Sequence, residues 1–329
     1  MKLKNNNPAR FLEKYNTLIF DMDGVITSEE CYWDTAALTV WEMHYGNAGA
    51  DKVRHIRAEL FYDDRLIKLF KERGVNSNWD LAYLVYAFLS KNKNAKETYE
   101  EVSKTDLSAF GLYDYAAKVL EQHRGVTPDK AVRLGLIWND IKDTFQECYW
   151  GSEQYYNVYG INTKKEREGL YKNEKPLFDI DDIKTLFSVL KNAGKKLCVG
   201  TGRPAAEIYA PLLSWDLYDY FEPDAIINYD DVEKAEKKLG KQGLTKPHPY
   251  MFLKAYFGRG CPDEKIFEDG DGVENCLVVG DAGADLMAAH GMGADFAAVL
   301  TGVSGESGRA YFEEQGAKYI LNDVMELII

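Results

Sequence analysis

The chain has 329 residues, of which 46% are hydrophobic and 28% are charged, as in an ordinary globular protein of one or two domains. Its formal net charge of -13 argues against nucleic acid and anionic membranes as general partners, although a bound metal ion can still attract an anionic substrate. No apolar run approaches the roughly 18 residues of a membrane helix, and the N-terminus lacks the apolar centre of a signal peptide. The five cysteines are scattered, so a cytoplasmic protein with free thiols is expected.

The first predicted element is a short apolar strand at Leu18–Phe20, and two aspartates follow it. Because residues i and i+2 of an extended chain face the same side, Asp21 and Asp23 should lie together where the buried strand ends. Two neighbouring carboxylates repel each other, and each is costly to keep ionised beside apolar surface. The pair therefore indicates a site for a hard metal ion, with a nucleophile and a proton donor.

Residues 28–176 show helical periodicity, many Tyr and Trp residues and few strand signals. The clearest helical patterns are Thr35–Tyr45, Asp80–Leu89, Tyr115–Gln122 and Asp129–Thr144. We expect a large α-helical domain here, a cap, inserted into an α/β domain made of residues 1–27 and 177–329. Its tyrosines are expected mainly to pack its helices or to form a dimer face, and less to line a pocket for a sugar or nucleoside.

After residue 177, short apolar runs alternate with helical patterns. The predicted strands are Lys196–Gly200, Ala225–Asn228, Cys276–Gly280, Phe296–Leu300 and Tyr319–Leu321. The predicted helices are Asp182–Ala193, Pro249–Tyr256 and Ala284–His290. Such alternation is typical of a parallel sheet with helices on both faces. The predicted fold class is therefore α/β, with a Rossmann-like parallel sheet as its core and the helical domain inserted after the first strand.

Four polar signals stand at the carboxyl ends of predicted strands. They are Asp21 with Asp23, Thr201 in Thr-Gly-Arg-Pro, Lys246 in Lys-Pro-His-Pro, and Asp281 with Asp285. Each alone is weak, because turns favour such residues in any case. In open α/β sheets, however, ligands bind beyond the carboxyl ends of the strands, so the four signals indicate one common site.

These side chains suit the transfer of a phosphoryl group. Asp21 can attack phosphorus and form an aspartyl-phosphate. Asp23 can protonate the leaving oxygen and then take a proton from the attacking water. Thr201 and the backbone N–H groups of the Gly200–Gly202 turn can donate to phosphoryl oxygens, and Lys246 supplies positive charge for the transition state.

A divalent cation is expected beside these groups. Asp281 adds a hard oxygen to that of Asp21, and such oxygens with water suit octahedral Mg²⁺. Asp285 has a second interpretation, because an acidic residue also favours the start of a helix. Arg203 follows the phosphate turn, and we interpret it equally as a substrate contact or as an outward salt bridge.

Together the motifs resemble the haloacid dehalogenase superfamily, and within it the group of phosphoglycolate phosphatases and β-phosphoglucomutases, whose helical caps are of the C1 type. The matching residues are Asp21-Met-Asp-Gly-Val-Ile26, Thr201, Lys246, and Gly280-Asp281 with Asp285. The resemblance covers residues 15–27 and 177–329. Two departures are Ala282, where relatives usually have Ser or Thr, and a cap that is much larger than usual.

The resemblance also implies roles. The metal ligands would be Asp21, the backbone carbonyl of Asp23, and Asp281, with Asp285 as a neighbour or occasional ligand. An aspartate at position 23 is similar to phosphatases and phosphomutases, whereas dehalogenases and phosphonatases differ there. The implied phosphate-binding residues are Gly24, Thr201, Gly202 and Lys246.

The sequence therefore predicts a Mg²⁺-dependent phosphatase that hydrolyses a small phosphorylated metabolite through an aspartyl-phosphate. A phosphomutase acting on a sugar phosphate is the alternative, because it would use the same residues and return the phosphoryl group to its substrate. A non-catalytic binding protein on this fold is disfavoured, because binding alone does not need both aspartates of the first motif. A monomer or homodimer is expected, without nucleic-acid or membrane partners.

Overall fold

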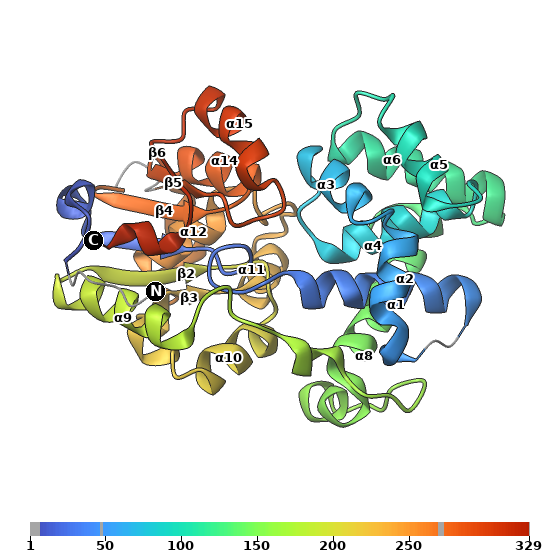
Figure 1. Cartoon of the computed structure of the whole chain (residues 1–329), viewed down its shortest axis with the longest axis horizontal. Helices are drawn as coiled ribbons and strands as arrows, with labels where there is room; N and C mark the ends of the chain where they lie inside the picture. Colours follow the sequence, from blue (N-terminus) through green and yellow to red (C-terminus); the bar gives the residue numbers. More distant parts are fainter. Residues whose placement is uncertain (1–6, 47–48, 269–272, 329) are drawn as a thin grey trace. The chain divides into compact units, whose positions relative to one another are not determined.

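A computed structural model of the protein describes residues 7–46, 49–268 and 273–328. The chain divides into two compact units, and each is described by itself (Figure 1). The core unit combines Met1–Ser28 with Lys175–Ile329, and the helical unit is Glu29–Glu174. The chain leaves the core unit after Ser28 and re-enters it at Lys175. These two residues are adjacent in space, since the backbone N–H of Ser28 donates to the carbonyl of Lys175 at 2.9 Å.

Within the described residues, the core unit is built on a six-stranded sheet with the order β3-β2-β1-β4-β5-β6 (Figure 1). Its strands are β1 Thr17–Phe20, β2 Lys196–Gly200, β3 Ile226–Ile227, β4 Cys276–Gly280, β5 Asp295–Val299 and β6 Tyr319–Leu321. Every neighbouring pair of strands is parallel, so the predicted α/β fold is confirmed. The strand order reverses beside β1, and ligands of such sheets bind at this switch point.

Strand β1 lies at the centre of the sheet because it is apolar on both faces. Leu18, Ile19 and Phe20 are fully buried. Successive side chains alternate, so Leu18 and Phe20 join one hydrophobic cluster and Ile19 joins the other. Strand β1 pairs with β2 on one side and with β4 on the other. The polar residues that follow β1 are therefore held between two neighbouring strands.

Helices cover both faces of this sheet. Phe187 of α9 (Ile180–Asn192) packs in the cluster of Phe20, and Phe252 of α12 (Tyr250–Phe257) packs in the cluster of Ile19. The predicted helices at residues 182–193, 249–256 and 284–290 correspond to α9, α12 and α14. The helices of the unit are α9 Ile180–Asn192, α10 Ala205–Ser214, α11 Tyr229–Leu239, α12 Tyr250–Phe257, α13 Asp263–Glu268, α14 Gly283–Gly291 and α15 Arg309–Glu314.

The helical unit has an aromatic core. Tyr83 and Tyr149 are almost completely buried, as expected for tyrosines that pack helices, whereas Tyr156 is half exposed. The buried carboxylate of Asp80 accepts hydrogen bonds from Arg133, Tyr113 and Trp138, so its charge is paired inside the unit. The helices are α1 Glu30–Tyr45, α2 Val53–Leu60, α3 Arg65–Glu72, α4 Asn78–Leu89, α5 Ala95–Val102, α6 Ala109–Arg124, α7 Pro128–Ala131 and α8 Leu136–Tyr159.

The prediction of one helix over residues 129–144 is wrong. The segment forms the short α7 and the start of α8, separated by a turn. Leu134 in this turn has a φ of 66°, which a continuous right-handed helix does not allow. Apolar periodicity continues across the turn, and for this reason the sequence pattern did not reveal it.

Helix α8 is kinked at Gly151, whose backbone is not helical, with φ 69° and ψ 172°. A Cβ atom at this position would lie 2.2 Å from the backbone nitrogen of Gly169, on the segment that returns along α8. The two segments form an isolated antiparallel bridge between Gly151 and Glu168. The kink therefore depends on a residue without a side chain.

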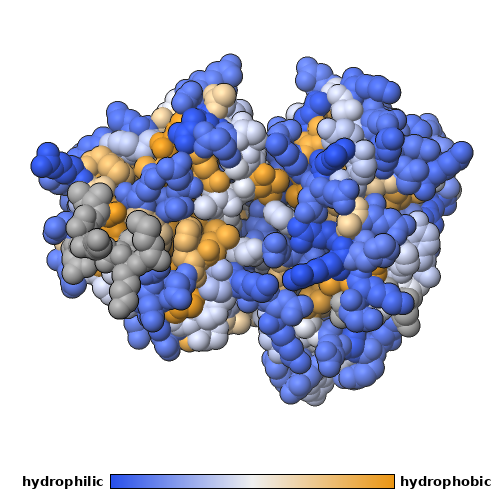
Figure 2. All heavy atoms as spheres, in the orientation of Figure 1, coloured by the Kyte–Doolittle hydropathy of each residue, from blue (hydrophilic) through white to orange (hydrophobic). Residues whose placement is uncertain are grey.

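Over the described residues, no helix is both long and apolar enough to cross a membrane. The face drawn in Figure 2 is mainly hydrophilic with some apolar residues among the polar ones, which is normal for a globular protein. The cysteines are free, as predicted, and Cys198 and Cys276 are buried in β2 and β4.

Candidate active site

The predicted site residues all lie in the core unit, around the carboxyl ends of β1, β2 and β4. Asp21 follows β1 directly, and its backbone N–H donates to the carbonyl of Val279 in β4 at 2.9 Å. Lys246 comes from the loop before α12, while Asp281 follows β4 and Asp285 lies in α14. The topology therefore brings distant parts of the sequence to one edge of the sheet, as the sequence predicts.

A tight turn after β1 sets the positions of the first motif. The carbonyl of Met22 accepts hydrogen bonds from the N–H groups of Ile26 and Thr27 at 2.8 and 2.9 Å. Gly24 has a φ of 73°, and a Cβ atom there would lie 2.2 Å from Oδ2 of Asp281. Glycine is needed for both reasons, because the turn is left-handed and another acidic side chain lies against it.

The ammonium group of Lys246 joins two of the predicted acidic residues. Its Nζ atom lies 3.0 Å from Oδ1 of Asp21 and 2.7 Å from Oδ1 of Asp285, and it donates to the carbonyl of Gly200 at 3.3 Å. The side chain is 2% exposed. Burial alone would lower the pKa of Lys246, but the two carboxylates outweigh this effect and raise it. The lysine is therefore a fixed positive charge at the site.

The carboxylate of Asp21 is buried beside two other carboxylates and one ammonium group. Burial raises its pKa to about 7, and the charges of Asp285 and Asp23 add to this rise while Lys246 opposes it. Ligand atoms of Asp21, Asp281 and Asp285 all lie within 4.8 Å of one another. Hard carboxylate oxygens so close together fit a Mg²⁺ ion, whose charge would offset their repulsion.

The three carboxylates are not equivalent. Asp285 is fully buried, and its two oxygens already face Lys246 and the backbone N–H of Ala282, the latter at 3.3 Å. Asp281 is only half-buried. The geometry therefore favours Asp21 and Asp281 as direct ligands, with Asp285 behind them holding the lysine.

The loop after β5 contributes to the site, although the sequence motifs did not include it. The hydroxyl of Thr301 donates to the carbonyl of Gly24 at 2.5 Å. A Cβ atom on Gly302 would lie 1.8 Å from Oδ2 of Asp281. Asp281 thus lies between two glycines, Gly24 and Gly302, and a side chain at either position would overlap its carboxylate. A Thr-Gly pair directly after an apolar strand was the available sequence signal.

Thr201 is fully buried at the end of β2, and its hydroxyl accepts a hydrogen bond from the N–H of Arg203 at 3.3 Å. Its own backbone N–H donates to the carbonyl of Ile227 at 3.0 Å. This amide is therefore already used within the sheet, and it is not free for a phosphoryl oxygen as the sequence suggested. Gly202 is exposed in the same turn, where an added Cβ atom would meet nothing.

The sequence left two interpretations of Arg203, a substrate contact and an outward salt bridge. The structure excludes the outward salt bridge. The guanidinium of Arg203 is 1% exposed and binds the carboxylate of Asp23, with Nη2 at 2.6 Å from Oδ1. Asp23 also accepts a hydrogen bond from the hydroxyl of Thr27 at 2.9 Å. Asp23, the expected proton donor, is thus held in place by Arg203 and Thr27. The sequence motifs did not predict either of these contacts.

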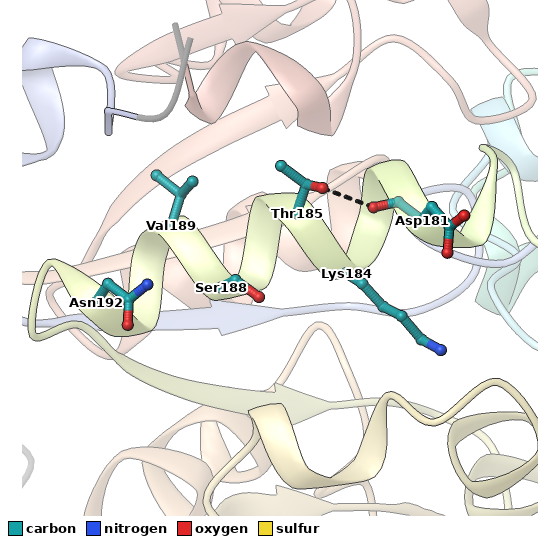
Figure 3. A pocket seen from close by; sticks show the side chains of 6 residues that line it. All are labelled: Asp181, Lys184, Thr185, Ser188, Val189 and Asn192. Atoms are coloured by element: carbon teal, nitrogen blue, oxygen red, sulfur yellow. Dashed lines mark hydrogen bonds between the residues drawn. The ribbon is translucent and has the colours of Figure 1, made fainter. Parts of the chain in front are cut away.

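A separate pocket runs along one face of α9 (Figure 3). Its lining residues all belong to this helix, and the hydroxyl of Thr185 donates to the carbonyl of Asp181 at 2.8 Å, within the helix itself. None of the predicted site residues lines it. The lining residues are Asp181, Lys184, Thr185, Ser188, Val189 and Asn192.

Known protein families and solved structures include proteins similar to this chain. The family model described as haloacid dehalogenase-like hydrolase matches residues 15–293. A comparison with curated proteins found no match. Among solved structures, the crystal structure of a Northeast Structural Genomics Consortium target has a TM-score of 0.73 and 26% identity, covering 95% of this chain and 97% of that chain. This likeness extends over both units of the chain.

Two further structures are more distant. A haloacid dehalogenase-like hydrolase from Bacteroides fragilis has a TM-score of 0.50 and 16% identity, covering 95% of this chain and all of that chain. A protein described as a phosphoglycolate phosphatase from Lactobacillus delbrueckii subsp. bulgaricus has a TM-score of 0.49 and 17% identity, covering 95% of each chain. The likeness to the Bacteroides fragilis protein shows a shared fold.

Proposed function

The chain belongs to the family of haloacid dehalogenase-like hydrolases, and we propose that it hydrolyses phosphate monoesters of small metabolites through an aspartyl-phosphate on Asp21. The observation that carries this proposal is the position of Asp21. Its carboxylate stands at the end of the central strand, 3.0 Å from the ammonium of Lys246 and within 4.8 Å of a carboxylate oxygen of Asp281. A nucleophilic carboxylate for an anionic substrate needs such a combination of fixed positive charge and metal-binding oxygens.

In the first step, a carboxylate oxygen of Asp21 forms a bond to phosphorus. The bond between phosphorus and the ester oxygen breaks, and this oxygen takes a proton from Asp23. Lys246 and the hydroxyl of Thr201 stabilise the negative charge on the phosphoryl oxygens.

In the second step, water attacks the phosphorus of the aspartyl-phosphate. Asp23, now ionised, takes a proton from this water, and the bond between phosphorus and the oxygen of Asp21 breaks. Inorganic phosphate leaves, and both aspartates return to their starting protonation states.

A Mg²⁺ ion would be held by Asp21, Asp281 and the backbone carbonyl of Asp23. When bound, it supplies positive charge that allows an anionic ester to approach the carboxylates. The helical unit, inserted directly after the first motif, is proposed as the part that selects a small substrate.

The test is phosphate release from a panel of phosphorylated metabolites, measured with Mg²⁺ for the wild type and for Asp21→Asn. The substitution should lower turnover by at least roughly 10³-fold, because it removes the nucleophile. A chelator should stop the wild-type reaction, and added Mg²⁺ should restore it. Near wild-type turnover in Asp21→Asn would end the proposal, and isomerisation of a sugar phosphate without phosphate release would indicate a phosphomutase instead.

A further inference from the structure

Each of the three guanidinium nitrogens of Arg203 donates a hydrogen bond to an acceptor in the core unit. Its Nε atom donates to Oδ1 and Oδ2 of Asp23 at 3.2 and 3.1 Å, and its Nη2 atom lies 2.6 Å from Oδ1. Its Nη1 atom donates to the backbone carbonyl of Glu207 in α10 at 3.1 Å. With a side chain that is 1% exposed, it presents no open face to a substrate.

The backbone of Arg203 is fixed as well. Its carbonyl accepts a hydrogen bond from the N–H of Tyr229, at the start of α11, at 2.9 Å. Its own N–H donates to the hydroxyl of Thr201 at 3.3 Å. The guanidinium therefore projects from a turn that is anchored to Thr201, directly after β2, and to the start of α11, so its position is set by the fold rather than by a ligand.

Asp23 is held from a second direction by Thr27. The hydroxyl of Thr27 donates to Oδ1 of Asp23 at 2.9 Å, and its backbone carbonyl accepts from the N–H of Gly24 at 2.9 Å. Thr27 is fully buried, whereas the side chain of Asp23 is 21% exposed. The carboxylate is thus fixed on its inner side and open on its outer side.

We propose that Arg203 is a positioning residue, which holds the carboxylate of Asp23 where it can exchange a proton with the leaving group and does not itself bind the substrate. This inference rests on the proposed function. Proton transfer requires the acid within hydrogen-bond reach of the ester oxygen, and a small misplacement of a catalytic group can cost about 10²-fold in rate. The planar fork of arginine can fix both oxygens of a carboxylate, which a lysine ammonium cannot do.

The experiment is a double-mutant cycle with Arg203→Lys, Asp23→Asn and the two combined, assayed with 4-nitrophenyl phosphate and with glycerol 3-phosphate. Arg203→Lys should lower kcat by roughly 10- to 100-fold and change KM by less than about 2-fold. In the Asp23→Asn background, it should cause almost no further loss, because Arg203 acts only through Asp23.

The leaving group gives a second readout that a structural defect would not produce. Nitrophenolate leaves without much help from an acid, whereas the alkoxide of glycerol needs a proton. The loss caused by Arg203→Lys should therefore be larger for glycerol 3-phosphate than for 4-nitrophenyl phosphate. The matched control is Arg259→Lys, because Arg259 binds a different carboxylate of the core unit, Asp231, at 3.0 Å. This control should keep wild-type kinetics on both esters.

If Arg203→Lys does not fold, Arg203→Gln carries the same test, because its neutral amide keeps a hydrogen-bond donor but loses the fork that contacts both oxygens of Asp23. A raised KM with unchanged kcat, persisting in the Asp23→Asn background, would overturn the proposal and make Arg203 a substrate contact. The proposal would also be overturned if the losses in kcat caused by Arg203→Lys and by Asp23→Asn multiply in the double variant. The same holds if Arg203→Lys lowers kcat equally for both esters. If the wild-type protein releases no phosphate from any ester, the proposed function and this inference are both overturned. If the wild type hydrolyses the esters but the double-mutant cycle does not give the expected result, only the role of Arg203 is overturned.

Discussion

Lys246 and Asp285 form a buried ion pair, with 2.7 Å between Nζ and Oδ1 and side-chain exposures of 2% and 1%. The same ammonium lies 3.0 Å from Asp21. A pair buried to this degree is costly to break, because the remaining charge has no water around it. The lysine thus links a structural aspartate in α14 to the proposed nucleophile after β1.

Lys246→Met should lower both activity and stability. It removes the charge that stabilises the transition state, for an expected loss of roughly 10²-fold or more in kcat. It also leaves two buried carboxylates without their partner, for roughly 3–5 kcal/mol in the free energy of unfolding. Phosphate release and denaturant unfolding measure the two effects.

The control for Lys246→Met is Lys254→Met. Lys254 is also buried, with its Nζ atom 2.7 Å from Oδ1 of Asp263, but it belongs to a different ion pair. This variant should lose stability and keep its activity per folded molecule. Equal loss of activity in both variants would show that Lys246 acts only through stability.

The stabilisation by Mg²⁺ should increase with pH. In the metal-free protein, the pKa of Asp21 is raised from 3.8 to about 7, so its protonated form is favoured by folding. Its contribution to stability is present below pH 3.8 and is lost as the pH rises through about 7. Protons compete with the metal for the same carboxylate, so the rise in Tm on adding Mg²⁺ should be larger at about pH 8 than at about pH 5. Thermal unfolding at several pH values measures this.

Asp21→Asn is the control for the pH dependence. Without the titrating carboxylate, the Mg²⁺-induced shift in Tm should be small and almost independent of pH. A wild-type shift of the same size at both pH values would contradict the assignment of Asp21 as a metal ligand.

Gly302→Ala should weaken Mg²⁺ binding. The added methyl group would lie 1.8 Å from Oδ2 of Asp281, so this carboxylate must move. We expect the Mg²⁺ concentration for half-maximal activity to rise roughly 10- to 100-fold, as when the support of a metal ligand is lost. Gly260→Ala is the control, because its nearest contact would be an ordinary 3.7 Å from Asp224. A Mg²⁺ dependence equal to that of the control would show that Asp281 can bind the ion from another position.

Gly151→Ala should destabilise the helical unit more than Gly160→Ala. The two glycines have similar φ values of 69° and 71°, but Gly151 has a ψ of 172°, in a region that is essentially limited to glycine, whereas Gly160 has the ordinary left-handed ψ of 11°. Only at Gly151 would the new Cβ atom meet backbone, 2.2 Å from the nitrogen of Gly169. Denaturant unfolding should show a difference of about 2 kcal/mol or more between the two variants. Equal losses would mean that the kink in α8 can relax.

The sheet could be predicted because its strands are short, apolar and bounded by turn residues. Leu18–Phe20 is buried on both faces, and such a run has few alternatives to a central parallel strand. The site followed from the sheet, since Asp21, Thr201 and Asp281 each stand directly after a strand. Helix boundaries were less predictable, and the turn at Leu134 interrupts a pattern that remains periodic on both sides.

Side-chain partners were the part that the sequence did not reveal. Arg203 and Asp23 are far apart in the chain, and nothing in either motif says which way the guanidinium points. The amide of Thr201 belongs to the sheet ladder because Ile227 ends the neighbouring strand β3 opposite it. Such choices depend on three-dimensional register, which a linear pattern does not contain.

The position of the helical unit within the chain affects how the protein is made. Strand β1 pairs with β2 and β4, but both are synthesised only after all of Glu29–Glu174 has been translated. Until then, an apolar strand with two unpaired edges remains attached to the growing chain, and such strands are prone to aggregate. The contiguous helical unit can complete its local contacts first, whereas the core unit must bring together its two ends across a long loop. In the cell, β1 therefore waits for its partner strands until translation has passed the whole helical unit.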